Sequence, residues 1–229
     1  MGRGLAVLGV NGKVPETLEL PASNGLIPGI VASDEFNRKK NEPLLPLVWQ
    51  WNHNPDNAFW SVTKRPGFLR LTTSRLDTNI LMARNMLTQR TIGPVSTGET
   101  AIDISNMKVG DQAGLMLLQR KFGWVGIKYI GNKKTVVMVS AQNGTVTAED
   151  VPATQQTVYL KARCDFNNRT DKGYFFYSFD GKTWKSVGQP LQMSYTLPHF
   201  IGYRFGLFNY ASENTGGYVD FDYFRIEAK

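Results

Sequence analysis

Cysteine and histidine are scarce in this chain of 229 residues. Its one cysteine, Cys164, excludes an internal disulfide. Its two histidines, His53 and His199, leave too few ligands for a zinc site of the usual His/Cys type. Cys164 lies in the strand-like run YLKARC without a flanking catalytic signature, so we expect a small core residue there. This scarcity argues against zinc and thiol chemistry.

Long apolar runs, helical periodicity and blocks of like charge are also missing. No apolar stretch approaches the roughly 18 residues that a membrane span needs, so no membrane partner is predicted. The net charge is +7, but the basic residues are scattered, and the densest short run is Arg38-Lys39-Lys40. Scattered charge is typical of solvated loops, so nucleic acid is not a predicted partner either. No segment keeps a helical period over three turns.

Strand patterns fill the chain from Asp34 onward. Short alternating or continuously apolar runs are separated by Gly, Asn and Asp turns. The clearest predicted strands cover residues 68–73, 81–90, 114–120, 122–130, 135–140, 174–179, 182–187, 203–210 and 218–226. Asp180-Gly181 predicts a tight hairpin, and the loop 211–217 suggests a second hairpin between the last two strands. The pattern predicts an all-β sandwich or barrel.

The first 33 residues differ from the rest of the chain. They are rich in Gly, Pro and small aliphatic residues, without a sustained period. This composition is typical of a linker or a wrapping arm. We therefore predict an arm over residues 1–33 and one β-sandwich domain over residues 34–229.

Aromatic and polar residues gather between Trp49 and Leu71, in WQWNHNPDNAFWSVTKRPGFLRL. Ring faces next to His and Asn side chains suit a sugar, because rings cover its C–H face and polar groups bind its hydroxyls. Trp51, followed by His53 and Asn54, is the best candidate here, and Trp124 is another. The alternative for any of these tryptophans is the core, which large aromatic residues dominate.

Basic and acidic residues offer further candidates. Arg84 and Arg90 alternate onto one face of the predicted strand 81–90, where they either meet a ligand or extend into solvent. Asp34 starts the β region and Asp222 lies in its last strand, and the first and last strands of a sandwich are often neighbours. Oxygen ligands suit calcium, so a structural calcium ion held by Asp34 and Asp222 is one interpretation and plain surface charge is the other. No pair of carboxylates stands in a pattern that argues for glycoside hydrolysis.

These residues resemble a known module, the C-terminal concanavalin A-like β-sandwich of glycoside hydrolase family 43 enzymes, the β-xylosidases and α-L-arabinofuranosidases. The matching pieces run in order through the chain: Asp34-Glu35-Phe36, WQWNHNPD, WSVTKRPGFLRL, ARNMLTQR, TAID, GDQAGLMLL, FFYSFDGKTW, GYRFGLFNY and GGYVDFDYFRIE. The arm piece AVLGVNGKVPETLELP also matches, although the family often has Trp-Pro where this chain has Leu5-Ala6.

The resemblance implies a jelly-roll sandwich of two antiparallel sheets, and an arm left from a preceding catalytic β-propeller domain. It implies a non-catalytic module whose partners are that propeller and xylan or xylo-oligosaccharide, and it favours an extracellular or periplasmic location. The predicted sugar-binding residues are Trp51, His53, Asn54, Arg84, Trp124, Tyr203 and Tyr210. One alternative is a structural domain that docks on the propeller and completes its active site without binding sugar. Another is a small hydrolase in its own right.

Overall fold

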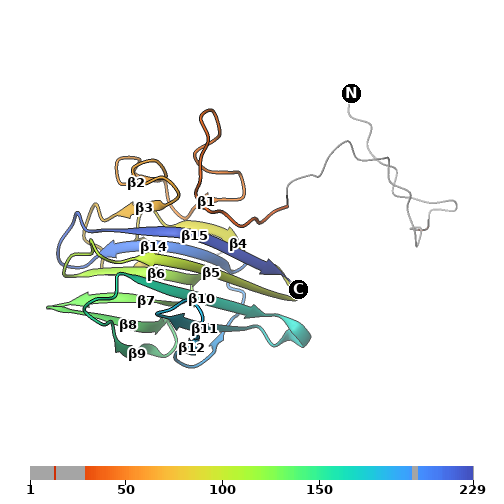
Figure 1. Cartoon of the computed structure of the whole chain (residues 1–229). Helices are drawn as coiled ribbons and strands as arrows, with labels where there is room; N and C mark the ends of the chain where they lie inside the picture. The colour runs from red at the N-terminus through yellow and green to blue at the C-terminus, as the bar shows by residue number, and fades with distance from the viewer. Residues whose placement is uncertain (1–12, 14–28, 198–200, 229) are drawn as a thin grey trace.

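The fold is almost entirely β. A computed structural model describes residue 13, residues 29–197 and residues 201–228. Its strands form two antiparallel sheets that face each other across a shared core (Figure 1). The predicted all-β jelly-roll sandwich is therefore confirmed. Most of the predicted arm lies outside the described residues, and no described helix is long and apolar enough to cross a membrane.

The first sheet has seven strands in the described part of the chain. Its strands, in spatial order, are β1 (Gln50–Trp51), β4 (Leu87–Arg90), β14 (Arg204–Ala211), β6 (Asp111–Leu118), β7 (Gly123–Ile130), β8 (Lys133–Ser140) and β9 (Gly144–Asp150). The predicted strands 114–120, 122–130 and 135–140 correspond to β6, β7 and β8. The long apolar runs of β6 and β7 fit their central position, since both faces of the sheet are covered there.

The second sheet alternates more regularly. Its strands, in order, are β12 (Lys185–Ser186), β11 (Lys172–Ser178), β10 (Thr157–Asp165), β5 (Val95–Asp103), β15 (Tyr218–Ala228), β3 (Leu69–Thr72) and β2 (Trp60–Ser61), and β13 (Leu191–Gln192) pairs with β11. In β10 every second side chain is buried and the others are partly exposed. The hairpin predicted at Asp180-Gly181 is confirmed by the pairing of β11 with β12.

Two hydrophobic clusters lie on the two faces of the first sheet. The inner cluster fills the space between the sheets and includes Cys164, as predicted. The outer cluster is covered by the segment before β4, from which Ile80 and Ala83 pack against the sheet. Trp124 of β7 and Phe208 of β14 belong to this outer cluster. The outer face of the sheet is thus sealed at its centre rather than open.

The predicted strand 81–90 is wrong over its first half. Residues Ile80–Met82 form a short 3₁₀ helix, η2, whose first turn is capped by the Asn79 side chain accepting from the N–H of Leu81. Asn85 has a positive φ of 54°, which extended strands do not tolerate. Only Leu87–Arg90 forms the strand β4. Arg84 therefore does not alternate with Arg90 on one strand face.

The second predicted hairpin is also wrong, although both of its strands exist. β14 pairs with β4 and β6 in the first sheet, while β15 pairs with β3 and β5 in the second. The loop between β14 and β15 therefore crosses from one sheet to the other. Asp34 and Phe224 exchange two backbone hydrogen bonds of 2.7 and 2.8 Å, so the expectation that the first and last segments are neighbours is confirmed.

Candidate functional site

Trp51 lies at the edge of the first sheet and is half-buried. Its ring packs against Trp60 of β2, with centroids 5.0 Å apart and planes tilted by 55°. Both rings also contact the core between the sheets. Much of each ring is therefore used in packing, and only part of its surface remains for a ligand.

His53 and Asn54 are exposed on the loop after β1. His53 Nε2 donates to the carbonyl oxygen of Leu81, 2.7 Å away. The Asn85 side chain accepts from and donates to the backbone of the same loop, at 2.7 and 3.0 Å. These bonds hold the loop beside the segment that carries the exposed Arg84. The structure thus gathers Trp51, His53, Asn54 and Arg84 in one region of the surface.

A hollow of about 580 Å³ lies next to Trp60. Its lining combines the indole ring with polar side chains and one exposed leucine: Leu44, Asn57, Ala58, Trp60, Ser61, Val62, Thr63 and Lys64. The Trp60 indole N–H donates to Asn57 Oδ1 at 2.8 Å, which fixes the orientation of the ring. A ring edge beside amide, hydroxyl and ammonium groups could accept a polar ligand such as a sugar.

Three of the predicted sugar-binding residues are buried, and this corrects the expectation that their rings are available to a sugar. Trp124 is 1% exposed, Tyr203 7% and Tyr210 8%. Trp124 packs edge-on against Phe208, with ring centroids 5.1 Å apart. The Tyr203 hydroxyl donates to the carbonyl of Lys121 at 2.8 Å. Burial raises the pKa of Tyr210 to about 12. None of the three offers a ring face to solvent.

The carboxylate of Asp34 is engaged by protein donors. It accepts from the N–H of Phe36, from two guanidinium nitrogens of Arg38 and from the indole of Trp49, all within 2.8 Å. Asp222 is exposed. Among the described residues, no group of three or more His, Cys, Asp and Glu side chains is placed to hold a metal ion. The calcium site predicted from Asp34 and Asp222 therefore gains no support from this geometry.

A second hollow, of about 670 Å³, lies where the arm meets the first sheet. Its lining is mainly aliphatic: Gly29, Ile30, Ala32, Pro46, Leu47, Val48, Gln50 and Arg90. Leu47 is 98% exposed and Ile30 61%. Neither residue was predicted as part of a site, although the apolar run over residues 43–48 was a signal for Leu47. Monomeric proteins seldom expose contiguous apolar patches without an interaction role.

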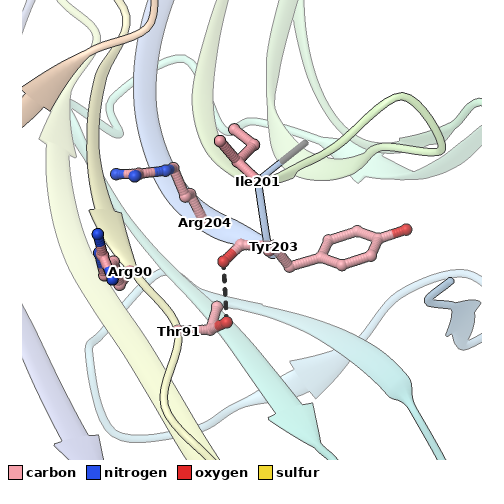
Figure 2. A pocket seen from close by; sticks show the side chains of 6 residues that line it. Arg90, Thr91, Ile201, Tyr203 and Arg204 are labelled. Carbon is pink, nitrogen blue, oxygen red and sulfur yellow. Dashed lines mark hydrogen bonds between the residues drawn. The ribbon is translucent and has the colours of Figure 1, made fainter. Parts of the chain in front are cut away.

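A third hollow, of about 290 Å³, opens at the ends of β4 and β14 (Figure 2). Arg90 and Arg204 lie directly opposite each other in the antiparallel pairing of these strands. Figure 2 shows both guanidinium groups on the same side of the strands, beside Thr91 and the backbone of Tyr203. Burial and the charge of Arg90 lower the pKa of Arg204.

Two neighbouring carboxylates, Asp103 and Asp220, occur in the second sheet, and arginine side chains compensate their charge. Arg65 bonds both Asp103 and Asp220, at 2.7 and 3.1 Å, and Arg70 forms a two-point pair with Asp220. Burial alone would raise the pKa of Asp103, but hydrogen bonds from Ser105 and Arg65 outweigh it and leave the pKa below its usual value. A glycosidase acid needs a raised pKa, so this pair is not suited to that reaction.

Two antiparallel sheets with a shared core, and a bridge from Asp34 to the last strand, define a concanavalin A-like β-sandwich domain. The family model described as the C-terminal concanavalin A-like domain of β-xylosidases matches residues 33–227. The chain belongs to this family, in which the domain is part of family 43 glycoside hydrolases.

Solved structures and curated sequences similar to this chain also come from family 43 glycoside hydrolases and β-xylosidases. A bifunctional GH43-CE protein of Bacteroides eggerthii is 63% identical with a TM-score of 0.86, over 96% of this chain and 29% of that one. An engineered GH43 glycoside hydrolase with endo-xylanase and exo-arabinofuranosidase activity is 28% identical with a TM-score of 0.78, over 91% of this chain and 42% of that one. A β-xylosidase of Formosa agariphila is 29% identical over 98% of this chain. The chain spans only 40% of that relative.

Proposed function

We propose that this chain is a non-catalytic accessory module that docks onto the catalytic β-propeller domain of a family 43 glycoside hydrolase acting on xylan-type substrates. The observation that carries this proposal is the aliphatic hollow around Ile30 and Leu47. It lies beside the arm, where a preceding domain would be attached, and its exposed leucine and isoleucine would be covered by that domain. The length of the relatives, more than twice that of the matching region, supports such a partner.

The arm is attached in a way that suits docking. The backbone N–H of Ala32 donates to Gln89 Oε1 at 3.0 Å, and Gln89 Nε2 donates to the carbonyl of Ala32 at 2.9 Å. Gln89 is fully buried in β4. These two hydrogen bonds hold Ala32 against the sheet next to the hollow. A domain that precedes Ala32 is thereby tethered at the edge of the hollow, which favours docking there.

Docking is tested by binding between this chain and a separately expressed catalytic domain of the Bacteroides eggerthii relative, measured by calorimetry. Leu47→Asp places a charge in the hollow and is expected to weaken binding about tenfold or more, because a desolvated charge without a partner is costly. Ile130→Asp is the matched control, since Ile130 is 63% exposed at the far end of β7. Equal affinity for the two variants, or no binding by the unchanged chain, contradicts docking through this hollow.

A second candidate function is recognition of xylan or xylo-oligosaccharide by the region of Trp51, His53, Asn54 and Arg84. The support is the gathering of these four residues and the hollow beside Trp60. The rings are only partly available, so binding would be weak, with a Kd on the order of 0.1–1 mM. His53 and Asn54 are the cleaner test positions, because both side chains are exposed.

Calorimetry with xylohexaose tests this second candidate. We expect the heat of binding to vanish in the double variant His53→Ala, Asn54→Ala. It should persist in Trp184→Ala, which removes a tryptophan near the β11–β12 hairpin. If the unchanged chain gives no heat with any xylan, only the docking function remains. Assay of the chain on aryl-xylosides and aryl-arabinosides should show no turnover, and measurable turnover would support a hydrolase instead.

A further inference from the structure

Arg90 and Arg204 form an unusual pair for a sheet, because like charges directly opposite each other destabilise antiparallel strands. Neither residue makes an ion pair with any described carboxylate. Arg204 Nη1 is buried without any hydrogen-bond partner among the described residues. A buried guanidinium nitrogen that has lost water and gained no acceptor is costly to the fold. Among the described residues, therefore, nothing offsets the repulsion between these two side chains.

Among the described residues, no acidic side chain lines this hollow. Thr91 is tied to Tyr203, since its backbone N–H and its hydroxyl both donate to the Tyr203 carbonyl, at 3.3 and 2.9 Å. These two hydrogen bonds fix the wall of the hollow. The two guanidinium groups are the charged donors that line it (Figure 2). The hollow, of about 290 Å³, has room for a group larger than a single water molecule.

We propose that Arg90 and Arg204 form a receptor for a carboxylate group. Guanidinium groups match carboxylates with two parallel N–H···O bonds, and two of them on one side can bind both oxygens. A carboxylate in the hollow would relieve the repulsion between the two guanidinium groups. The carboxylate is carried by an acidic sugar or, where the proposed docking holds, by an acidic side chain of the attached domain.

The test begins with thermal unfolding of the whole chain in sodium glucuronate. Glucose in sodium chloride of the same ionic strength is the neutral control. We expect glucuronate to raise the Tm in a saturable way, because a ligand that binds only the folded state stabilises it. Glucose should leave the Tm unchanged.

Three variants of the arginine pair and one control variant locate the effect. Arg90→Met and Arg204→Met keep much of the aliphatic stem and should abolish the response to glucuronate. Without ligand, Arg204→Met should have a Tm equal to or above that of the unchanged chain, since it removes an unpaired buried donor. Arg204→Lys keeps the charge but loses the planar fork, so its apparent affinity should fall about tenfold. Lys182→Met, which removes an exposed cation from the turn after β11, should respond like the unchanged chain.

The outcomes separate the possible sources of the carboxylate. Saturable binding of glucuronate by the chain alone supports the receptor and an acidic sugar as its ligand. No response to glucuronate, combined with weaker binding of Arg204→Met to the catalytic domain, supports the receptor with a protein carboxylate as its ligand. The proposal is overturned if glucuronate has no effect and both methionine variants bind the catalytic domain normally. It is also overturned if Arg204→Met lowers the Tm while the glucuronate response persists, because Arg204 then has a structural role only.

Discussion

The indole N–H of Trp49 donates to the carboxylate of Asp34 at 2.8 Å, joining the start of the sandwich to the segment that leads into β1. The same carboxylate pairs with Arg38, and the two side chains are only 7% and 9% exposed. Asp34 also bridges Phe224 of β15 through its backbone. One buried aspartate thus ties the first residues of the sandwich to its last strand.

Asp34→Ala should destabilise the fold strongly. The change leaves the buried guanidinium group of Arg38 without its partner, and breaking a buried pair in this way costs about 3–5 kcal/mol. Glu35→Ala is the control, because its pair with Arg225 is about half exposed and such pairs contribute about 0–1 kcal/mol. Urea unfolding measures both. Equal losses for the two variants would show that the Asp34 network is not a structural centre.

The Asp34 network should also appear in acid unfolding. Burial alone would raise the pKa of Asp34, but hydrogen bonds from Arg38, Trp49 and Phe36 outweigh it and hold the pKa below the usual 3.8. The unfolded chain therefore binds the proton more tightly, so this contribution is present above pH 3.8 and is lost as the pH falls through the lowered value. In Asp34→Asn, the free energy of unfolding should fall less steeply as the pH is lowered below 3.8. An unchanged pH dependence would contradict this role of Asp34.

Asp111 should give stability the opposite dependence on pH. Burial raises its pKa to about 6, although the N–H of Lys108 donates to it at 2.7 Å. The folded chain then holds a proton that the unfolded chain has lost, so stability falls as the pH rises from 3.8 to about 6. Because each pKa unit is worth 1.36 kcal/mol, the loss is about 3 kcal/mol.

Asp111→Asn tests this dependence, because its side chain does not titrate. Unfolding free energies measured between pH 4 and 7 should fall less for the variant than for the unchanged chain. Asp150→Asn is the control, since Asp150 is exposed and pairs with Lys133 at the surface. If Asp111→Asn leaves the slope unchanged, the buried carboxylate is not the group that titrates.

Gly98 should not tolerate a side chain. A Cβ atom at this position of β5 would lie 2.8 Å from the ring of Phe205, which is fully buried in the opposite sheet. Gly98→Ala should therefore cost about 1–3 kcal/mol through overpacking. Gly202→Ala is the control, because a Cβ atom added there would have no neighbour within 4 Å among the described residues. Thermal unfolding separates them, and a Gly98→Ala protein as stable as the control would contradict the close contact.

Trp124→Ala should act on stability rather than on ligand binding. The ring is sealed in the outer cluster, so its loss should cost about 3–5 kcal/mol. Trp184→Ala should cost less, because Trp184 is only partly buried and lies beneath the ammonium group of Lys161. Urea unfolding makes the comparison. A small loss for Trp124→Ala would mean that the ring is more accessible than its packing indicates.

Much of the fold was predictable from local patterns. The runs 114–120 and 122–130 match β6 and β7 because continuous apolar residues fit strands covered on both faces. The Asp180-Gly181 turn was predictable because a glycine there takes the positive φ of 70° that a tight turn needs. The 3₁₀ turn at Ile80 was missed, because Asn79 and Asn85 act through side-chain bonds that no strand pattern contains.

The candidate site was predictable only in part. Trp51 ends β1 and the exposed residues His53 and Asn54 follow it directly, so their proximity could be predicted from their spacing in the sequence. Trp124 was misplaced because alternation assigns it to a face of the sheet without showing what covers that face. Ile80 and Ala83, far away in the sequence, close over it. The opposition of Arg90 and Arg204 likewise depends on the pairing of β4 with β14, which joins distant segments.

The order of short apolar runs, turn residues and family motifs was enough to determine a two-sheet concanavalin A-like sandwich, because strand alternation and turn geometry are properties of neighbouring residues. Tertiary structure decided which rings are sealed, which leucines stay exposed and which arginines face each other. Burial and charge depend on what packs against a side chain from elsewhere in the chain, and for Trp124, Leu47 and Arg204 that environment comes from segments many residues away.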